Sequence, residues 1–494
     1  MKTEDLMKRL LGILLALLMA ASMTACTTEI EEDVFENDAS LVTSGNTTEE
    51  LSSSSSSLVI EPETPPKSGS ESEKADSSSS SKESSGNTSS PSVSKTSVSS
   101  ASSSSGSSAA SSIVSSVQEK TPAEESKPVS GEVCAVWISY LELQPILQNK
   151  TEKQFSSSVE TMFSNLENDG FNTVYVHARS HSDAFYDSDI FPWSVYCTGT
   201  EGKDPGFDPL SVMVEKAHTH HLKIEAWINP YRVKGTTDTS KISSGSPAYD
   251  WLDTDKVISV SGSGIFYNPA DEEVIDLVVS GVEEIIRNYD VDGIHFDDYF
   301  YPTTDESFDA SYYRAYKNGG GTLSLAAWRR QNVNTLVKNV YSAIKSIDSG
   351  CRFGISPTGN MDSNFSSLYC DVATWVTSSG YIDYICPQIY YGFNHSSKPY
   401  LDVLSEFNDA IACRDVELIV GLAAYKSGAE DDYAGSGKKE WIENTDILSR
   451  QIIAARNESH YGGFSLYRYD SLYHPSSAVS TAIGEEKDNL QDVM

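Results

Sequence analysis

Two adjacent carboxylates, Asp297 and Asp298, stand directly after a short apolar run in the middle of the chain. The surrounding segment, residues 290–302, reads D-V-D-G-I-H-F-D-D-Y-F-Y-P. Neighbouring carboxyl groups suit acid–base chemistry, in which one group delivers a proton and another supplies negative charge. Hydrolysis of a glycosidic bond uses such a pair: one carboxyl protonates the leaving oxygen, and one carboxylate acts as nucleophile, base or electrostatic partner.

The apolar run before the two carboxylates predicts a buried strand. Because side chains alternate along a strand, His295, Asp297 and Tyr299 share one face, while Ile294 and Phe296 share the other. We expect the apolar face to meet covering helices and the polar face to point inward. In that arrangement His295 is expected to orient Asp297 by a hydrogen bond.

A helical pattern leads into this strand. The letters N-P-A-D-E-E predict a helix start, with Asn268 as N-cap and Pro269 as the first helical residue. Apolar residues then recur at helical spacing, at Val274, Leu277, Val278, Val282, Ile285 and Ile286. A helix followed by a strand is the repeating unit of a parallel sheet that helices cover.

Strand-like and helix-like runs alternate through eight rounds in the C-terminal part of the chain. The expected strands are residues 134–140, 172–179, 223–229, 293–297, 352–356, 381–390, 416–423 and 463–469. Eight such units predict an α/β fold, a (β/α)8 TIM barrel over residues 129–484 with a C-terminal tail at 485–494. A doubly wound open sheet is the alternative. No Gly-rich phosphate turn follows the first strand, which argues against a nucleotide-binding version of that sheet.

The carboxyl ends of the expected strands are rich in aromatic, amide and guanidinium groups. Barrel enzymes hold their functional residues at these ends. Aromatic faces stack on sugar rings, and amides and Arg hydrogen-bond to hydroxyls, so this rim predicts a polyhydroxylated ligand. The expected substrate-binding residues are Arg179, Trp193, Asn229, Tyr231, Arg232, His295, Tyr299, Gln388, Tyr390, Tyr391, Tyr425 and Tyr467. For Trp193, in the loop after the second strand, packing onto the barrel is an equal alternative.

The carboxyl groups have different expected roles. Asp297 is the essential carboxylate, as nucleophile or as stabiliser of a cationic intermediate. Asp298 and Asp183 compete as the general acid, with Asp470 behind them. The alternatives are an outward, salt-bridged Asp298 that holds its loop and an Asp183 that closes an Asx turn. No H-x-H or H-E-x-x-H spacing surrounds His295, so we expect neither a metal nor a cofactor.

The N-terminal region has the features of an export signal followed by a tether. In residues 1–26 a basic pair precedes an apolar run that ends in M-T-A-C. These letters resemble the lipobox of bacterial lipoproteins and predict lipidation of Cys26; cleavage near Ala25 to give an ordinary secreted protein is the alternative. Residues 27–128 are Ser-rich and predict a disordered linker. We therefore expect a lipid-anchored domain on the extracellular face of the bacterial cell membrane.

Charge and cysteine usage narrow the range of partners. The net charge of −35 argues against nucleic-acid binding, which needs a basic surface. Apart from Cys26, the cysteines form no C-x-x-C pair, and Cys134 and Cys386 lie in strand-like runs as small buried residues. We expect a monomer whose partners are a glycan and, through the lipid alone, the membrane.

Several segments together resemble the bacterial glycosyl-hydrolase-like TIM-barrel family ten. They are A-V-W-I, D-A-F-Y-D-S-D-I-F-P-W-S from Asp183, D-P-G-F-D-P-L from Asp204, E-A-W-I-N-P-Y-R from Glu225, the segment 290–302, W-R-R-Q-N-V-N from Trp328, F-G-I-S-P from Phe353 and I-D-Y-I-C-P-Q-I-Y from Ile382. The matching segments span nearly everything from Val133 onward. The resemblance implies a TIM barrel that acts on a glycan, which in some members is bacterial cell-wall glycan.

A more distant resemblance bears on the acid. The letters D-G-I-H-F-D-D-Y are similar to the D-G-x-D-x-D-x-E signature of chitinase-type barrels. This places Asp297 at the last Asp of the signature and Tyr299 where those enzymes have the acid Glu, so the acid has to come from Asp298 or from another loop. The missing Glu favours one competing function, a carbohydrate-binding surface protein without turnover. A third possible function, a metal-dependent polysaccharide deacetylase, has little support because the spacing of metal ligands is missing.

Overall fold

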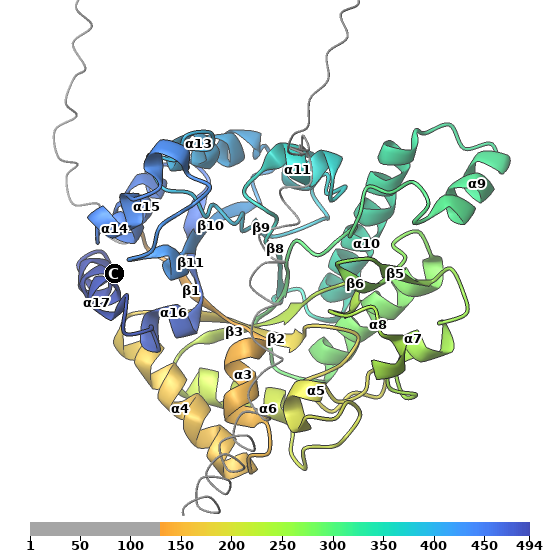
Figure 1. Ribbon diagram of the computed structural model, residues 1–494, viewed down its shortest axis with the longest axis horizontal. Helices are drawn as coiled ribbons and strands as arrows, with labels where there is room; N and C mark the ends of the chain where they lie inside the picture. The colour runs from red at the N-terminus through yellow and green to blue at the C-terminus, as the bar shows by residue number, and fades with distance from the viewer. Residues whose placement is uncertain (1–128) are drawn as a thin grey trace, which may run out of the picture. The chain divides into compact units, whose positions relative to one another are not determined.

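The computed structural model describes residues 129–494. The predicted signal peptide, the lipidation site at Cys26 and the Ser-rich linker lie outside the described residues. In the described part, eight parallel strands close into a ring in the order β1-β2-β3-β7-β8-β9-β10-β11, and β11 pairs with β1 (Figure 1). The predicted (β/α)8 TIM barrel is confirmed.

All neighbouring barrel strands are parallel, so their carboxyl ends open on one side of the ring. The strands are β1 (Val133–Ile138), β2 (Thr173–Arg179), β3 (Lys223–Ile228), β7 (Gly293–Phe296), β8 (Arg352–Ile355), β9 (Tyr384–Ile385), β10 (Glu417–Ala423) and β11 (Tyr461–Tyr467).

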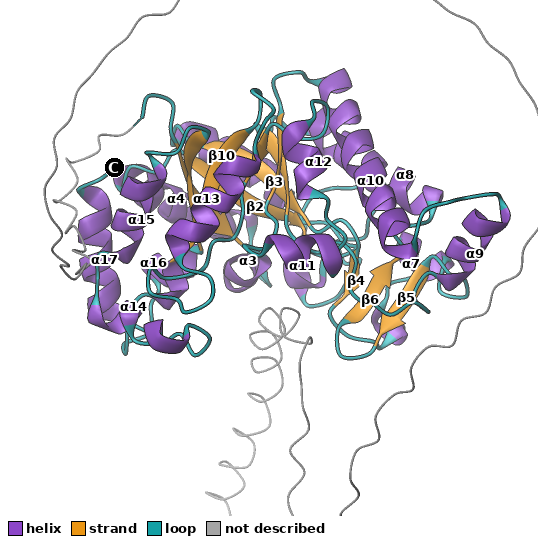
Figure 2. Cartoon of the chain, turned by 90° about the horizontal axis from the view of Figure 1, so that it is seen from above, coloured by secondary structure: helices purple, strands orange, loops and turns teal. Residues whose placement is uncertain are grey.

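Helices surround the barrel strands (Figure 2). The longer helices are α4 (Glu152–Asn168), α6 (Pro209–Thr219), α8 (Glu272–Asn288), α9 (Ala310–Asn318), α10 (Leu325–Ile347), α13 (Tyr400–Ala410), α15 (Ile447–Ala455) and α17 (Ser480–Gln491). The shorter helices are α3 (Tyr140–Leu147), α5 (Val195–Thr198), α7 (Pro247–Asp250), α11 (Met361–Ser366), α12 (Val372–Thr377), α14 (Glu440–Glu443) and α16 (Tyr469–Tyr473).

Apolar side chains fill two separate cores. The core inside the barrel contains Val133, Ala135, Trp137, Tyr175, Trp227, Tyr384, Cys386 and Ile419. The outer core, between strands and helices, includes Ile294 and Phe296, whereas the ring of His295 contacts those of Trp137 and Tyr175 inside the barrel. The predicted alternation along β7 is therefore confirmed, and it aims the polar face of this strand inward.

The start of α8 differs from the sequence expectation. Its N-cap is Asp271, whose side chain accepts a hydrogen bond from the Val274 N–H at 3.1 Å. Asn268 instead accepts from the Ala270 N–H at 3.1 Å and closes the turn before the helix. Both residues have the short polar side chain that suits an N-cap, and Asp271, three positions after Asn268, is the one that caps the helix.

Most strands end within two residues of the expected position, and for two of the strands that end early the reason is clear. β1 ends at Ile138 because Ser139 and Glu142 form a capping box that starts α3 at Tyr140. β9 covers only Tyr384–Ile385, within the expected range 381–390. Pro387 follows closely, and a proline has no N–H to donate to a strand ladder.

The long segment between β3 and α8, expected as a loop, contains a small antiparallel sheet. Its strands are β4 (Arg232–Lys234), β6 (Gly264–Tyr267) and β5 (Val257–Val260), in that order. Gly264, with φ of 124°, lies so near the Lys234 carbonyl that a Cβ would sit 2.1 Å from that oxygen. A glycine is therefore required where the two strands meet, although the same residue type suggests a loop in the sequence.

The C-terminal residues belong to the fold and do not form a separate tail. α17 continues to Gln491, and its Ile483 and Leu490 are buried. Glu486 is also buried and accepts a hydrogen bond from the Leu448 N–H at 2.6 Å, in the first turn of α15. The expected boundary at residue 485 is thus wrong, because the few buried residues of α17 lie in a largely polar sequence that does not indicate a packed helix.

Candidate active site at the barrel mouth

Asp297 lies just beyond the carboxyl end of β7 and is 3 % exposed. The Trp227 Nε1–H donates to its Oδ2 at 3.1 Å, and the Tyr299 N–H donates to its Oδ1 at 3.2 Å. Burial, and then the charge of Asp298, raise the pKa of Asp297 well above its usual range. The two N–H donors and the Arg232 guanidinium oppose that rise. The Asp297 carboxyl is therefore fixed in place, and its neutral form is favoured beside a second carboxylate.

Asp298 is half-buried and lies next to the loop that follows β9. Gln388 links the two, because its Nε2 donates to Asp298 Oδ1 at 3.4 Å and to the Ser356 carbonyl at 3.1 Å. A neutral amide thus holds the half-buried carboxyl beside the buried one. Two interacting carboxyls titrate as a pair, so together they favour a state that holds one proton.

Trp227 is held in position by a stacked histidine. The ring of His177 lies 3.4 Å from that of Trp227, centre to centre, with an interplanar angle of 18°. His177 Nδ1 accepts from the Tyr140 N–H at 3.1 Å, so its Nε2 carries the proton that Asn229 Oδ1 accepts at 2.9 Å. Burial lowers the pKa of His177 to about 3, which keeps this ring neutral. Asn229, a predicted site residue, therefore acts on Trp227 only through His177.

His295 does not hydrogen-bond to Asp297, so that expectation is wrong. Its Nε2 accepts from Trp137 Nε1 at 3.1 Å, and its Nδ1 meets the Tyr384 hydroxyl at 2.7 Å. With both ring nitrogens occupied and no exposed surface, His295 lies beneath the open mouth. Trp227 takes the role that the sequence suggested for this histidine.

Two predicted site residues lie together beside Asp297. The Arg232 guanidinium carbon is 4.7 Å from the centre of the Tyr299 ring, a cation–π distance. Both side chains are half-buried. Arg232 thus brings a positive charge close to Asp297, where it favours the ionised form of that carboxyl.

Three predicted site tyrosines form a cluster at the ends of β9, β10 and β11. The ring centres of Tyr390, Tyr425 and Tyr467 lie 5.8–6.2 Å apart. Tyr425 is 44 % exposed, while Tyr467 also meets the ring of Trp137 at 5.9 Å. This tyrosine cluster offers solvent-facing aromatic surface of the kind on which sugar rings stack.

The structure does not bring Arg179 to the mouth. A register shift between His177 and Arg179 pairs Arg179 with Ile228, a residue of the outer core. The guanidinium carbon lies 4.0 Å from the centre of the Phe191 ring, and a Cβ on Gly281 of α8 would come within 2.4 Å of its Nη1. The expected rim position is wrong because this bulge inverts the alternation of the strand.

Asp183 is enclosed in the loop after β2 and is 0 % exposed. Within residues 129–494 neither of its carboxylate oxygens has a partner at full hydrogen-bond geometry, although the Ser194 side chain and the His181 backbone lie close enough to lower its pKa. Burial raises the pKa of Asp183, and the nearby charges of Lys234 and Arg179 oppose this only in part. The expected position across an open mouth from Asp297 is therefore wrong in this conformation.

Three aromatic residues of the predicted site pack on the outer core instead of the mouth. Tyr231 is fully buried with its ring 6.4 Å from that of Phe300. Tyr391 is half-buried, 5.0 Å from the ring of His395. Trp193 is half-buried against the same core, which agrees with the alternative expectation that it packs onto the barrel. All three residues lie beyond the ends of their strands, where the alternation of side chains along a strand no longer applies.

A buried carboxylate that the sequence did not single out lies after β1. Glu142 is 2 % exposed and pairs with Arg468, whose Nη1 lies 2.5 Å from its Oε1. Burial raises the pKa of Glu142, and Arg468 opposes the rise. The letters S-Y-L-E of its capping box were the available signal. Asp470 lies alongside, where it pairs with His474 at 2.8 Å and its N–H donates to Glu142.

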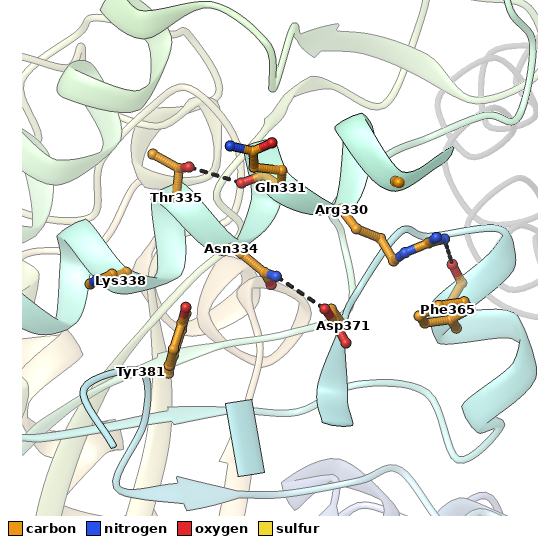
Figure 3. Close-up of a pocket in the computed structure, with 9 residues that line it drawn as sticks. Arg330, Gln331, Asn334, Thr335, Lys338, Phe365, Asp371 and Tyr381 are labelled. Carbon is orange, nitrogen blue, oxygen red and sulfur yellow. Dashed lines mark hydrogen bonds between the residues drawn. The ribbon is translucent and has the colours of Figure 1, made fainter. Parts of the chain in front are cut away.

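A groove of about 420 Å³ on the flank of the barrel is separate from this mouth (Figure 3). It runs along α10 beside Phe365, Asp371 and Tyr381. Its polar groups largely hold the neighbouring helices: Asn334 donates to Asp371 at 3.2 Å, and Arg330 donates to the Phe365 carbonyl at 3.0 Å while covering its ring. The groove thus joins α10 to α11 and α12.

Three further features concern residues 129–494 as a group. No set of three or more His, Cys, Asp or Glu side chains in this region is placed to hold a metal ion. The cysteines of this region are all free thiols, and Cys134 and Cys386 are buried as expected. No helix found there has the length and apolar character needed to cross a membrane.

The chain matches one protein family over most of the barrel. The model of the family described as Glycosyl hydrolase-like 10 matches residues 132–435. Glycosyl hydrolase YngK of Bacillus subtilis (strain 168) is 35 % identical over 355 residues, which are 67 % of this chain and 68 % of the relative. Glycosyl hydrolase DigH of Escherichia coli (strain K12) is 32 % identical over 389 residues, 72 % of this chain and 86 % of the relative. Among solved structures, the PgaB (BpsB) glycoside hydrolase domain from Bordetella bronchiseptica aligns with a TM-score of 0.47 and 12 % identity, covering 71 % of this chain and 98 % of that one.

Proposed function

Since the chain belongs to the glycosyl hydrolase-like 10 family, we propose that it hydrolyses glycosidic bonds of a polysaccharide at the barrel mouth. The observation that carries the proposal is the carboxyl pair at the end of β7. Asp297 is buried and fixed by two N–H donors, and the half-buried Asp298 lies next to it. A pair that holds one proton supplies both an acid and a carboxylate, which glycoside hydrolysis needs.

We assign proton delivery to Asp298 because it lies nearer to solvent and is held by a neutral amide. In the reactive state the proton of the pair then lies on Asp298, while the two N–H donors and Arg232 stabilise the Asp297 carboxylate against the burial that favours its protonated form. Asp297, beneath it, takes the part of nucleophile or of stabiliser for an oxocarbenium-like or oxazolinium-like species. The tyrosine cluster and the Arg232–Tyr299 pair flank the two carboxyls and offer stacking surface and hydrogen-bond donors to a sugar.

The proposed substrate is bacterial cell-wall glycan, and the proposed location is the extracellular face of the cell membrane. Support for both comes from the sequence. The substrate rests on the family resemblance, since some members are associated with such glycan. The location rests on the M-T-A-C letters, which resemble a lipobox and end at Cys26. A lipid-anchored hydrolase would meet this polymer directly.

The first test replaces the charge of Asp297 and keeps its shape. Asp297→Asn is expected to abolish release of reducing ends from cell-wall glycan with little change in melting temperature. Turnover at the wild-type rate would remove Asp297 from the mechanism. A wild-type protein that binds glycan and never cleaves it would instead support the non-catalytic carbohydrate-binding function.

The second test separates the acid from the other carboxylate. Asp298→Asn should lose about 10²–10⁴-fold in turnover on natural glycan, the usual range for general acid catalysis. It should keep most activity on an activated aryl glycoside, whose leaving group departs without protonation. An equal loss on both substrates would contradict the assignment of Asp298 as the acid.

A further inference from the structure

The groove beside α10 has the size and shape of a binding site. Its volume of about 420 Å³ lies within the range of roughly 300–1,000 Å³ that small-molecule sites have. α10 lines it from Ala327 to Lys338, which spans roughly 16 Å at the rise of an α-helix. Phe365 lies at one end and Tyr381 toward the other (Figure 3). The groove is therefore elongated and has an aromatic ring near each end.

The middle of the groove is already fixed by its own hydrogen bonds. Asn334 Nδ2 donates to Asp371 Oδ2 at 3.2 Å, and Asn334 Oδ1 accepts from Trp375 Nε1 at 2.6 Å. Asp371 is also the N-cap of α12, where its Oδ1 accepts from the Thr374 N–H at 3.3 Å. Because these side chains are held before a ligand arrives, binding costs little additional ordering there.

Other groups of the groove have unused binding capacity. Phe365 is 48 % exposed, although Arg330 covers one face of its ring at 3.7 Å. The exposed side chains of Gln331 and Lys338 and the half-buried Tyr381 hydroxyl line the groove without a polar partner among residues 129–494. The groove thus offers an aromatic surface together with free hydrogen-bond donors and acceptors.

This combination fits a sugar better than an apolar peptide or a polyanion. A sugar ring has apolar faces that stack on an aromatic ring, and hydroxyls at its edge that hydrogen-bond to amides. An apolar segment would cover Gln331 and Lys338 and leave both without a partner. Asp371 offsets one of the two positive charges of the groove, on Arg330 and Lys338, so the groove lacks the concentrated positive charge that a polyanion needs.

A series of contacts connects the Phe365 end of the groove to the barrel mouth. Asn364, next to Phe365 on α11, donates from Nδ2 to the Thr358 carbonyl at 2.8 Å. Thr358 forms a parallel β-bridge with Gln388, and Gln388 donates to Asp298 at 3.4 Å. α11 is thus attached to the same loops that hold the carboxyl pair. A long polymer that occupies this end of the groove can continue toward the mouth.

We propose that the groove is a second binding site for the glycan, apart from the site of cleavage. Phe365 supplies the stacking surface, while Gln331 and Lys338 hydrogen-bond to hydroxyls. The choice of glycan as the ligand rests on the proposed glycosidase function. Because one polymer chain can contact the groove and the mouth together, the second contact raises the affinity for long chains and not for short ones.

The test measures binding of insoluble bacterial cell-wall glycan by the full chain carrying Asp297→Asn, which is expected to bind without cleavage. Adding Phe365→Ala should weaken this binding about tenfold, the scale of one aromatic contact. Gln331→Ala, a second and independent change in the groove, should weaken it severalfold. Leu401→Ala is the matched control, since Leu401 is 49 % exposed on α13 and does not line the groove. It should bind as its parent does.

Cleavage by chains that keep Asp297 gives a separate measurement. Phe365→Ala should lower the ratio of turnover on the polymer to turnover on an activated aryl glycoside severalfold, because the aryl glycoside is too short to reach the groove. Leu401→Ala should leave this ratio at the wild-type value. Melting temperatures show whether each variant is folded.

Each outcome supports or overturns the proposal. Undiminished glycan binding by folded Phe365→Ala and Gln331→Ala variants would overturn it and leave the proposed function intact. If Phe365→Ala does not fold, Gln331→Ala decides by the same criterion. Binding that depends on Phe365, in a chain that never cleaves glycan, would support the groove and contradict the proposed function. If the Asp297→Asn protein binds no glycan, the groove proposal fails, and cleavage by wild type alone decides the proposed function.

Discussion

Two aspartates of this chain show that environment, more than residue type, decides which carboxyl can take part in chemistry. Asp297 and Asp183 each follow a barrel strand, and burial raises the pKa of both. Asp297 has two N–H donors and a half-buried carboxyl, Asp298, as its neighbour. Asp183 is sealed near Lys234 and Arg179. Only the first arrangement places a half-buried carboxyl beside a buried one.

This contrast gives a prediction for Asp183→Asn. The variant should keep wild-type turnover on natural glycan and on an activated aryl glycoside, because its carboxyl is closed off from the mouth. The free energy of unfolding should fall by about 1 kcal/mol, a typical value for a single substitution, since Arg179 loses a nearby opposite charge. Kinetics on the two substrates and thermal unfolding measure both effects. Selective loss on natural glycan would return Asp183 to the role of general acid and would require the loop after β2 to open.

Residue positions in the site could be predicted only as far as strand alternation holds. It holds for Asp297 because β7 is regular up to its last residue. It fails for Arg179, where a bulge with no sequence signature reverses the face. The hydrogen-bond partners of His295 could not be predicted, because Trp137 and Tyr384 lie 158 and 89 positions away in the chain. Local periodicity carries no information on contacts of that separation.

At the scale of elements, one remote cap ties the C-terminal helix to the barrel. α15 begins at Asp446 without a side-chain cap of its own, and Glu486 of α17 accepts the Leu448 N–H in its place. Burial raises the pKa of Glu486 from 4.5 to about 7. Because the folded state raises this pKa, the stability it contributes is full below the ordinary value and is lost as the pH rises through about 7.

Glu486→Gln tests this linkage. The wild-type free energy of unfolding should decline between about pH 4.5 and 7, by on the order of 3 kcal/mol from this group at 1.36 kcal/mol per pKa unit. The Gln variant cannot ionise, so its decline over the same range should be smaller by that amount. A residual slope is expected from Glu225, whose pKa is also raised to about 7. Parallel pH profiles from denaturant unfolding would contradict the role given to Glu486.

The order of elements was predictable because each strand is an apolar run and each helix has an apolar stripe. The sheet β4–β6–β5 was not, since Gly and Ser in that segment favour a loop and cross-strand pairing is not local. α17 was missed for a related reason: its few buried residues lie among many polar ones. Elements whose stability comes from packing on a neighbour leave the weakest trace in their own sequence.

At the scale of the whole molecule, the barrel closes only when its first and last strands pair. β1 begins at Val133 and closes the ring by pairing with β11 near the C-terminus. The catalytic part is therefore expected to start close to residue 129, and protease treatment of the full chain should trim it to about that point and then stop. Cleavage spread evenly through residues 129–494 would argue against such a unit.

The predicted anchor and linker give the last prediction. A flexible linker of about 100 residues has an end-to-end distance of roughly 50–60 Å and can be pulled out severalfold further, enough for a barrel fixed at Cys26 to search a wall layer around it. Cys26→Ala should move the protein from the membrane fraction to the soluble fraction, with unchanged release of reducing ends from isolated cell-wall glycan. Fractionation and the activity of each fraction measure this directly, and the Asp297→Asn protein, which keeps Cys26, provides the matched control that stays membrane-bound. Membrane association of the Cys26→Ala protein at the wild-type level would show that the lipid is not the anchor. Loss of activity together with release would show instead that the anchor does more than hold the barrel in place.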